Sequence, residues 1–413
     1  MSRLATPADA VAWLRAPAAI RARCGLILTA AERDELEHFR LRPERLEAAA
    51  DYVVETIRLN YPDLTIPYHS RWRHFAAGHV DRWAQLAAQL GETPREERAR
   101  IRFDLVITSV LLDAGAGDRW RYREPATGAV LARSEGLAVA SFDLFAAGTL
   151  SAIPGQPLRA DASALAALDE ATLARAFQVD RNNPLVGLAG RVGLLNALGR
   201  TIERRPELFG VAQPRIGGLF DHLAASAVDR RLPAARILEA VLDAFGPIWP
   251  GRIELAGINL GDVGRHSAVR TDDLTDGLVP FHKLSQWLTY SLLEPLEEAG
   301  VVVTDLDRLT ALAEYRNGGL LIDLGVLEPK HAAVLGEPHA GASEVVVEWR
   351  ALTVALIDRL AQLIRARLGL SAEALPLAKV LEGGTWSAGR RIAATLRPDG
   401  GPPLRLISDG TLF

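Results

Sequence analysis

The chain has 413 residues, of which 47 are Lys or Arg and 51 are Asp or Glu, so its formal net charge is -4. This length allows two or three average domains, the lack of a basic excess argues against a nucleic-acid-binding protein, and no apolar run reaches the roughly 18 residues that span a bilayer. A single cysteine, Cys24, excludes an intrachain disulfide and a thiolate metal cluster, and we expect a cytoplasmic protein without nucleic-acid or membrane partners.

Apolar residues recur at helical spacing along most of the chain, which predicts a mainly α protein. Thr29, with acidic residues after it, predicts a helix start, because Thr is a good N-cap and acidic side chains favour the first turn. The expected helices cover residues 7–23, 30–59, 76–90, 94–114, 162–177, 185–204, 215–226, 233–246, 281–299, 305–314, 317–326 and 344–369.

Strand signals are confined to two segments, each of which predicts a short β-hairpin. The first surrounds Thr127-Gly128, and the second turns at residues 398–401, near the C-terminus. Because strands and helices do not alternate, a doubly wound sheet is not expected. The segment from Pro154 to Pro157 is the best candidate for a boundary. It predicts an N-terminal helical lobe over 1–155 and a second lobe over 156–413, with one continuous domain as the alternative.

A basic turn lies in the first predicted lobe, within the sequence PYHSRWRHF. It contains His69, Arg71, Arg73 and His74 among aromatic residues. Arginine offers a planar fork that matches phosphate or carboxylate oxygens, and the aromatic residues indicate partial burial, where a charge needs a partner. An anion-binding turn and a solvated basic turn are both consistent with this pattern.

The helix predicted over 281–299 is apolar nearly all round and carries a narrow polar strip of Lys283, Gln286 and Tyr290. Buried polar groups need partners, and we expect this strip to line a cavity. Two carboxylates are available to face Lys283: Asp276, just before the helix, and Glu314, later in the chain. Such a set is suited to acid–base work on a neutral substrate. A structural ion-pair network, or a capping role for Asp276, is the alternative.

The motifs of several common enzyme classes are missing, since the chain has no GxSxG, HExxH or Walker sequence. His69, His74 and His79 are five residues apart, a spacing that does not place them on one helix face, so a zinc site is not predicted. We therefore expect neither a metal nor a cofactor. Near the C-terminus, Glu382 and Trp386 flank a Gly-Gly pair, and a packing segment explains them best.

Six segments together resemble the uracil-catabolism protein family over almost the whole chain. They are PYHSRWRHF, DLVITSVLLDAGAGDRW, RSEGLAVASF, VPFHKLSQWLTYSLLEPL, LAEYRNGGLLIDLGVL and KVLEGGTWSAGR. The resemblance implies a role in a pathway that turns uracil into its nucleotide, opens the ring and ends with urea. Such a pathway requires a step that separates urea from ribose or ribose phosphate, and it implies pathway enzymes as partners.

Two segments, TDGLVPFHKLSQWL and ALAEYRNGGLLIDLGVL, are also similar to the queuosine-salvage N-glycosidases. Those proteins are mostly helical, are related to DNA glycosylases and hydrolyse an N-glycosidic bond in a nucleoside phosphate. The match implies a helical DNA-glycosylase-like core. In this match Asp276 and Lys283 are the same residue types as in that family's motifs. Glu314 stands where that family has Asp, and His282 stands where it has Tyr.

Together these resemblances imply a metal-independent N-glycosidase that hydrolyses ribosylurea, or its 5′-phosphate, to urea and the sugar. Asp276 would stabilise the oxocarbenium-like transition state, with Lys283 and Glu314 fixing its ionisation. The predicted substrate contacts come from the basic turn, which would hold a phosphate, and from the glycosidase-like segments, namely His69, Arg71, Arg73, His74, His282, Gln286, Tyr290, Tyr315 and Arg316. The alternatives are a non-catalytic protein that binds a ring-opened pyrimidine intermediate, and a ureido amidohydrolase.

Overall fold

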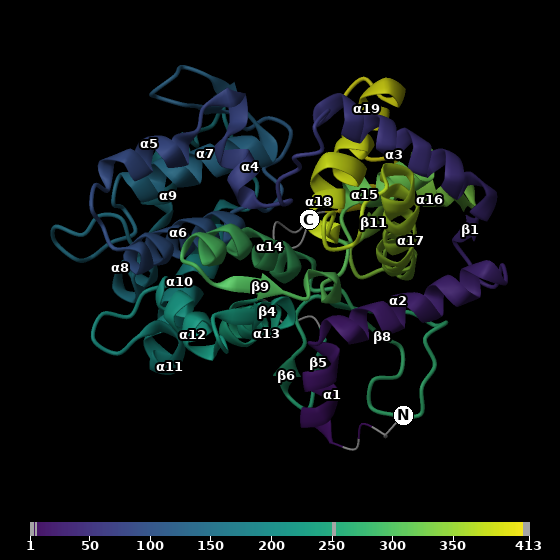
Figure 1. Cartoon of the computed structure of the whole chain (residues 1–413), viewed down its shortest axis with the longest axis horizontal. Helices are drawn as coiled ribbons and strands as arrows, with labels where there is room; N and C mark the ends of the chain where they lie inside the picture. The colour runs from purple at the N-terminus through teal and green to yellow at the C-terminus, as the bar shows by residue number, and fades with distance from the viewer. Residues whose placement is uncertain (1–3, 5, 250–252, 408–413) are drawn as a thin grey trace. The chain divides into compact units, whose positions relative to one another are not determined.

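The computed structural model describes residues 4, 6–249 and 253–407, and it consists of helices with short two-stranded sheets (Figure 1). The prediction of a mainly α fold is confirmed. Within the described residues, the first of two compact units takes its segments from 1–69, 251–286 and 305–407, and the second from 70–250 and 287–304. Both units are discontinuous in sequence, and this division does not follow the predicted boundary at residue 155. The segment from Pro154 to Pro157 is instead a turn inside the second unit, where the N–H of Gln156 donates to the carbonyl of Ile153.

The first unit is built mainly from helices at the two ends of the chain. Its elements are α1 (Pro7–Leu14), α2 (Pro17–Glu32), β1 (Phe39–Leu41), η1 (Pro43–Arg45), α3 (Leu46–Asn60), β5 (Glu254–Leu255), β6 (Ile258–Asn259), β7 (Val263–Arg265), β8 (Leu278–Pro280), η4 (Leu306–Arg308), α15 (Tyr315–Asp323), β10 (Leu327–Pro329), α16 (Ala332–Gly336), β11 (Pro338–Ala340), α17 (Glu344–Leu368), α18 (Leu377–Lys379), η5 (Val380–Trp386), α19 (Ser387–Leu396) and β12 (Arg405–Ile407).

The N-terminal helices differ from their predicted bounds because proline divides them. Pro17 occupies the first turn of α2, where its missing N–H costs nothing, and it ends the preceding helix. The helix predicted over 7–23 is therefore two helices. The predicted start at Thr29 is wrong, since Thr29 lies inside α2 and its hydroxyl donates to the carbonyl of Gly25 at 3.0 Å.

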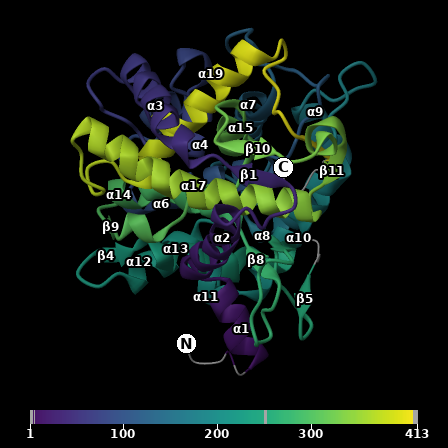
Figure 2. The ribbon, with the colours of Figure 1, turned by 90° about the vertical axis from the view of Figure 1, so that its right-hand side faces the viewer.

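The core of the first unit forms where α2 and α3 pack against the long helix α17, which crosses the view in Figure 2. On α2 the residues Ile20, Cys24 and Ile27 are fully buried, which matches one face of a helix. On α3 the same spacing buries Ala50, Val53 and Ile57. Burying each large apolar side chain contributes about 1.5–3 kcal/mol, so this packing fixes α17 and the polar residues that it carries.

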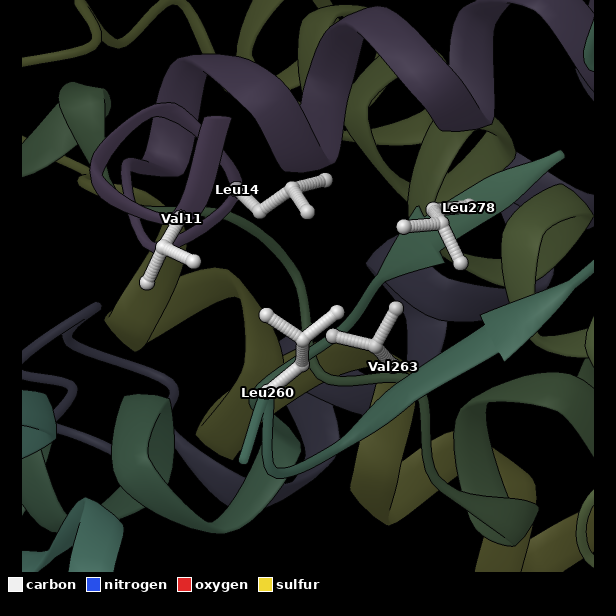
Figure 3. Close-up of a cluster of buried hydrophobic side chains, with 5 residues drawn as sticks. All are labelled: Val11, Leu14, Leu260, Val263 and Leu278. Atoms are coloured by element: carbon white, nitrogen blue, oxygen red, sulfur yellow. The ribbon is translucent and has the colours of Figure 1, made fainter. Parts of the chain in front are cut away.

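A smaller apolar cluster joins α1 to the hairpin of β7 and β8 (Figure 3). It consists of Val11 and Leu14 from α1 with Leu260, Val263 and Leu278 from the hairpin segment. β7 and β8 are antiparallel, and Val263 pairs with Pro280. The cluster therefore holds the hairpin end from which the candidate active site is built.

The second unit consists of the central part of the chain. Its elements are α4 (Arg71–Phe75), η2 (Ala77–His79), α5 (Arg82–Gln89), α6 (Arg95–Leu111), β2 (Tyr122–Arg123), β3 (Val130–Leu131), α7 (Arg133–Ala146), α8 (Ala162–Ala167), α9 (Glu170–Ala176), α10 (Leu188–Arg204), α11 (Pro206–Phe209), α12 (Gly218–Ser226), β4 (Arg231–Pro233), α13 (Ala234–Phe245), η3 (Gly246–Ile248) and β9 (Val302–Thr304). Helix α14 (Lys283–Glu298) contributes its first turn to the first unit and its remainder to the second.

Of the two predicted hairpins, only the first is present. β2 pairs with β3 in antiparallel register, and Gly128 in the connecting turn has a φ of +73°, which glycine adopts without strain. The C-terminal hairpin is wrong. Its first arm continues helix α19 to Leu396, and β12 pairs in parallel with β11 instead. Within the described residues, no helix combines the length and the apolar character needed to cross a membrane.

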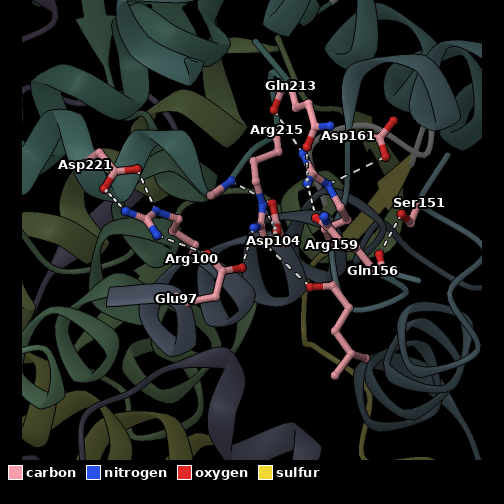
Figure 4. Close-up of polar contacts among 12 residues, drawn as sticks. Glu97, Arg100, Asp104, Ser151, Gln156, Arg159, Asp161, Gln213, Arg215 and Asp221 are labelled. Carbon is pink, nitrogen blue, oxygen red and sulfur yellow. Dashed lines mark hydrogen bonds and ion pairs between the residues drawn. The ribbon is translucent and has the colours of Figure 1, made fainter. Parts of the chain in front are cut away.

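An ion-pair network ties α6 to two loops of the second unit (Figure 4). Asp104 on α6 is fully buried and accepts hydrogen bonds from the Arg215 guanidinium and from the N–H of Gly217, the latter at 2.6 Å. Burial nevertheless raises the pKa of Asp104 to about 6, although Arg215 and Gly217 favour the carboxylate. The folded protein therefore holds a proton on Asp104 more tightly than the unfolded chain does.

This raised pKa predicts a pH-dependent stability. Between about pH 4 and pH 6 the folded state binds more protons at Asp104 than the unfolded state, so the free energy of unfolding falls as the pH rises, by about 3 kcal/mol in all. Guanidinium denaturation at pH 4.5 and pH 7 measures most of this loss, because part of it lies below pH 4.5. The side chain of Asn in Asp104→Asn cannot ionise, so this variant should lose less free energy of unfolding than the wild type between the two pH values. An equal loss in both proteins would contradict the prediction.

Candidate active site

Asp262, at the entry to β7, fixes the first turn of α14. Its carboxylate accepts the N–H of Lys283 at 2.9 Å. Its backbone carbonyl accepts the N–H groups of Phe281 at 2.9 Å and of His282 at 3.2 Å. One residue therefore accepts all three N–H groups from Phe281 to Lys283. These bonds fix the position at which α14 begins.

Arg350, from the buried face of α17, joins this turn to the start of α15. It forms a two-bond ion pair with Asp262, at 2.8 and 2.7 Å, and its Nε donates to the carbonyl of Ala313 at 3.3 Å. Burial opposes ionisation of Asp262, but Arg350 and the N–H of Lys283 hold its pKa at about 2. A continuous chain of bonds therefore runs from Lys283 to the residue before Glu314.

Glu314 is the N-cap of α15. Its carboxylate accepts the N–H groups of Arg316 at 2.8 Å and Asn317 at 2.6 Å, and the residue is only 8% exposed. A second link between α14 and this segment comes from Gln286, whose amide hydrogen-bonds to the buried Thr310. The Glu314 carboxylate is thus held by two backbone N–H groups, and its segment has two links to the first turn of α14.

The start of α15 is also tied to η5, which is a π-helix. The Thr385 hydroxyl on η5 donates to the side-chain carbonyl of Asn317 at 2.8 Å. On the same π-helix, Glu382 pairs with Nδ1 of His69 at 2.7 Å, and the Trp386 ring lies 5.5 Å from the His69 ring. π-helical turns are found frequently at functional sites. A buried His–Glu pair is also the arrangement that orients an imidazole for proton transfer.

His282 shows backbone strain at the start of α14. Its φ is +47°, a value that is rare for a residue other than glycine. Residues with such strained backbone angles cluster at functional sites. The ring is buried, burial lowers the pKa of His282, and Nε2–H donates to the carbonyl of Leu14 at 3.0 Å. This contact anchors the turn, and substrate contact by His282 stays a prediction.

Asp276 lies apart from this cluster, on the loop that precedes β8. Its carboxylate accepts the N–H of Thr271 at 2.7 Å and lies 3.5 Å from Arg270, with a side chain that is 37% exposed. The whole of β8 separates it from Lys283, so the capping alternative for Asp276 is wrong: Asp262 supplies that bond. Its catalytic role stays a prediction.

The predicted basic turn is divided between the two units, with His69 in the first and the other three residues in the second. Arg71 is fully buried, pairs with Asp113 at 3.1 Å and donates to the Ser109 hydroxyl at 2.7 Å. Arg73 pairs with Glu294 at 2.5 Å. Both cations therefore have carboxylate partners within the protein, and phosphate binding by this turn stays a prediction.

The remaining predicted contacts are mostly buried. His74 packs its ring edge-on against Trp287, at 5.7 Å between ring centroids. Tyr290 is fully buried in the part of α14 that belongs to the second unit. Arg316 donates to the carbonyl of Gly400 at 2.6 Å, and its guanidinium lies over the Tyr315 ring. Lys283 and Tyr315 are partly exposed.

Comparisons with known proteins agree on one family. A family model described as "Protein of unknown function (DUF1688)" matches residues 13–413 and so takes in the whole cluster from His69 to Trp386. Protein urg3 of Schizosaccharomyces pombe is 39% identical over 414 residues, which covers 98% of this chain and 99% of that protein. Uracil catabolism protein 4 of Lachancea kluyveri is 38% identical over 411 residues, which covers 91% and 92% respectively.

Proposed function

The chain belongs to the DUF1688 family, and from this membership we propose that it acts in uracil catabolism. One of its full-length relatives carries that pathway in its name. The resemblance to the uracil-catabolism family, which the sequence motifs indicated, is confirmed by these matches.

The reaction that we propose is hydrolysis of the N-glycosidic bond of ribosylurea or its 5′-phosphate. The bond between C1′ and the urea nitrogen breaks, the oxygen of water bonds to C1′, and a proton from that water ends on the urea nitrogen. The products are urea and ribose or ribose 5-phosphate. The sugar passes through a positively charged, oxocarbenium-like transition state, which a fixed carboxylate near C1′ stabilises.

The observation that supports this reaction most is the bonded link between the starts of α14 and α15 through Arg350. It keeps the Lys283 end of one helix close to the Glu314 end of the other. Glu314 is buried and held by two N–H groups, whereas Asp276 is half-exposed on a loop. We therefore assign the charge-stabilising role to Glu314 in preference to Asp276, with Lys283 beside the leaving group.

The His69–Glu382 pair is suited to move the proton of the attacking water. Glu382 fixes the ring of His69 through Nδ1, and an imidazole held in this way can act as a general base. The catalytic set would then contain a carboxylate, an ammonium group and a carboxylate-oriented imidazole, all in the first unit.

Purified protein incubated with ribosylurea, with and without a 5′-phosphate, is expected to release urea and the free sugar, which mass spectrometry detects. Heat-denatured protein is the control for spontaneous breakdown, and activity should persist in a chelator, because the proposed mechanism uses no metal. Release of ammonia in place of urea would contradict the glycosidase and indicate hydrolysis of the ureido group. Binding of ribosylurea without turnover would contradict it in favour of a binding protein.

A further inference from the structure

Helix α6 borders two pockets of the second unit, each lined by three arginines. One has a volume of about 510 Å³ and contains Arg100, Arg159 and Arg215. The other, which we term the α6 N-terminal pocket, has a volume of about 410 Å³. It is lined by Arg95, Arg98 and Arg102 from α6 and by Pro295, Glu298 and Ala299 at the end of α14. The two pockets differ in how their arginines are paired.

In the larger pocket every arginine has a carboxylate partner (Figure 4). Arg100 pairs with Asp221 at 2.8 Å and with Glu97 at 3.0 Å. Arg215 pairs with Glu97 and with the buried Asp104. Arg159 lies 3.8 Å from the carboxylate of Asp161. Each of these arginines has a carboxylate nearby, although Nε of Arg159 makes no hydrogen bond among the described residues, and we interpret this network as structural.

In the α6 N-terminal pocket the arginines are poorly matched. Among the described residues, the side chain of Arg95 makes no hydrogen bond or ion pair, and the side chain of Arg98 donates only to the carbonyls of Thr93 and Gly91. Arg102 pairs with Glu298, a side chain that is 62% exposed. The lining therefore carries three cations against two carboxylates, Glu298 and Glu92.

Arg102 supplies a second, independent sign of an anion site. Its side chain is only 4% exposed, it lines the pocket, and its Nε has no hydrogen-bond partner among the described residues. Its guanidinium is held over the Trp72 ring at 4.0 Å and the Trp83 ring at 5.1 Å. A buried N–H group without an acceptor is costly, and a bound anion would supply that acceptor.

The backbone of α6 adds to this positive field. The pocket lies at the N-terminus of a 17-residue helix whose N-cap is Pro94, and no side chain caps its first N–H groups. Helix N-termini favour phosphate through their free N–H groups and the helix dipole, and here Glu96 and Glu97 in the first turn offset part of this field. The pocket volume is in the range of sites for small molecules.

We propose that the α6 N-terminal pocket binds the phosphate group of a small phosphate ester, with Arg95, Arg98 and Arg102 as its contacts. Glu298 of this pocket and Lys283 of the candidate active site are at opposite ends of α14, so the pocket is a second site. The proposal does not depend on the glycosidase activity.

Isothermal titration calorimetry with ribose 5-phosphate, in low-salt buffer without phosphate, tests this site. The wild-type protein should bind ribose 5-phosphate and not ribose. Arg95→Ala and Arg98→Ala should each weaken binding by about tenfold or more, the effect of losing one charge-assisted hydrogen bond. Neither side chain is buried, so both variants are expected to fold, which thermal melting checks.

The matched control is Arg119→Ala, which removes an exposed arginine of the same unit outside the pocket and should leave the affinity unchanged. A failed glycosidase assay does not affect this result, because the titration measures binding and not turnover. Absence of binding, or equal affinity in wild type, Arg95→Ala and Arg98→Ala, would overturn the proposal. An equal loss in Arg119→Ala would also overturn it, because the effect would then be one of net charge.

Discussion

Replacing Glu314 with Gln is expected to slow urea release from ribosylurea by roughly a hundredfold to a thousandfold, the effect of removing one preorganised charge-stabilising group. Gln has the shape of Glu without its negative charge. Its amide oxygen can still accept the N–H of Asn317, but its NH2 group then faces the N–H of Arg316, so one of the two capping bonds is lost. The transition state should therefore lose stabilisation while the helix start survives. Steady-state measurement of kcat, together with thermal melting of the variant, checks both parts of this expectation.

Asp276→Asn is the matched control for Glu314→Gln, because it removes a carboxylate of the same unit with equally little change in shape. The side chain of Asp276 is half-exposed, and its contacts are with Thr271 and Arg270, so we expect most of the activity to remain. A wild-type rate in Glu314→Gln with a large loss in Asp276→Asn would contradict the assignment to Glu314. It would support the role that the sequence alone predicts for Asp276.

Removing the Asp262 carboxylate is expected to lower the free energy of unfolding by about 3–5 kcal/mol, the cost of leaving a buried charge without its partner. Asp262→Ala leaves the guanidinium of Arg350, which is 4% exposed, without its two ionic hydrogen bonds, and it frees the N–H of Lys283. Guanidinium denaturation monitored by circular dichroism measures the loss.

Two further variants compare the stability effect of this buried pair with that of an exposed ion pair and test whether Asp262 and Arg350 are coupled. Glu32→Ala removes a partner of Arg359 in an exposed pair of the same unit, and it should cost less than about 1 kcal/mol. The double variant Asp262→Ala with Arg350→Met should lose much less than the sum of its single changes, since no charge then stays unpaired. Additive losses in the double variant would mean that the pair is not coupled.

Sequence patterns predicted those parts of the fold that depend on local periodicity. The helix from Arg95 to Leu111 and the helix from Glu344 to Leu368 agree closely with the expected ranges, because apolar residues recur at helical spacing along each of them. The helix predicted over 305–314 is wrong: beyond η4 the segment up to Glu314 is neither helix nor strand, and Gln286 and Arg350 from distant parts of the chain hold it. No local pattern carries that information.

The candidate site was predictable only in part for the same reason. Lys283 and Glu314 stood out as polar residues in apolar segments, and the structure links the segments that carry them. The sequence does not predict Asp262 as a site residue, because its hairpin is too short to give an alternating pattern. Arg350 left one signal, a charge inside the apolar run of α17, and such a charge requires a buried partner. For Glu382 the sequence predicts a packing segment, because its pairing with His69 spans 313 residues and leaves no local pattern.

The discontinuity of the first unit has a consequence for the order in which the chain folds during translation. Helices α2 and α3 leave the ribosome early, but their partner α17 begins only at Glu344. At a translation rate of about 5–20 residues per second, the apolar faces of α2 and α3 stay without that partner for roughly 15–60 s. In the second unit, by contrast, α4 to α13 are contiguous and can pack as they emerge. The nascent chain therefore completes most of its middle before its beginning, and we expect its N-terminal helices to need chaperone protection in the interval.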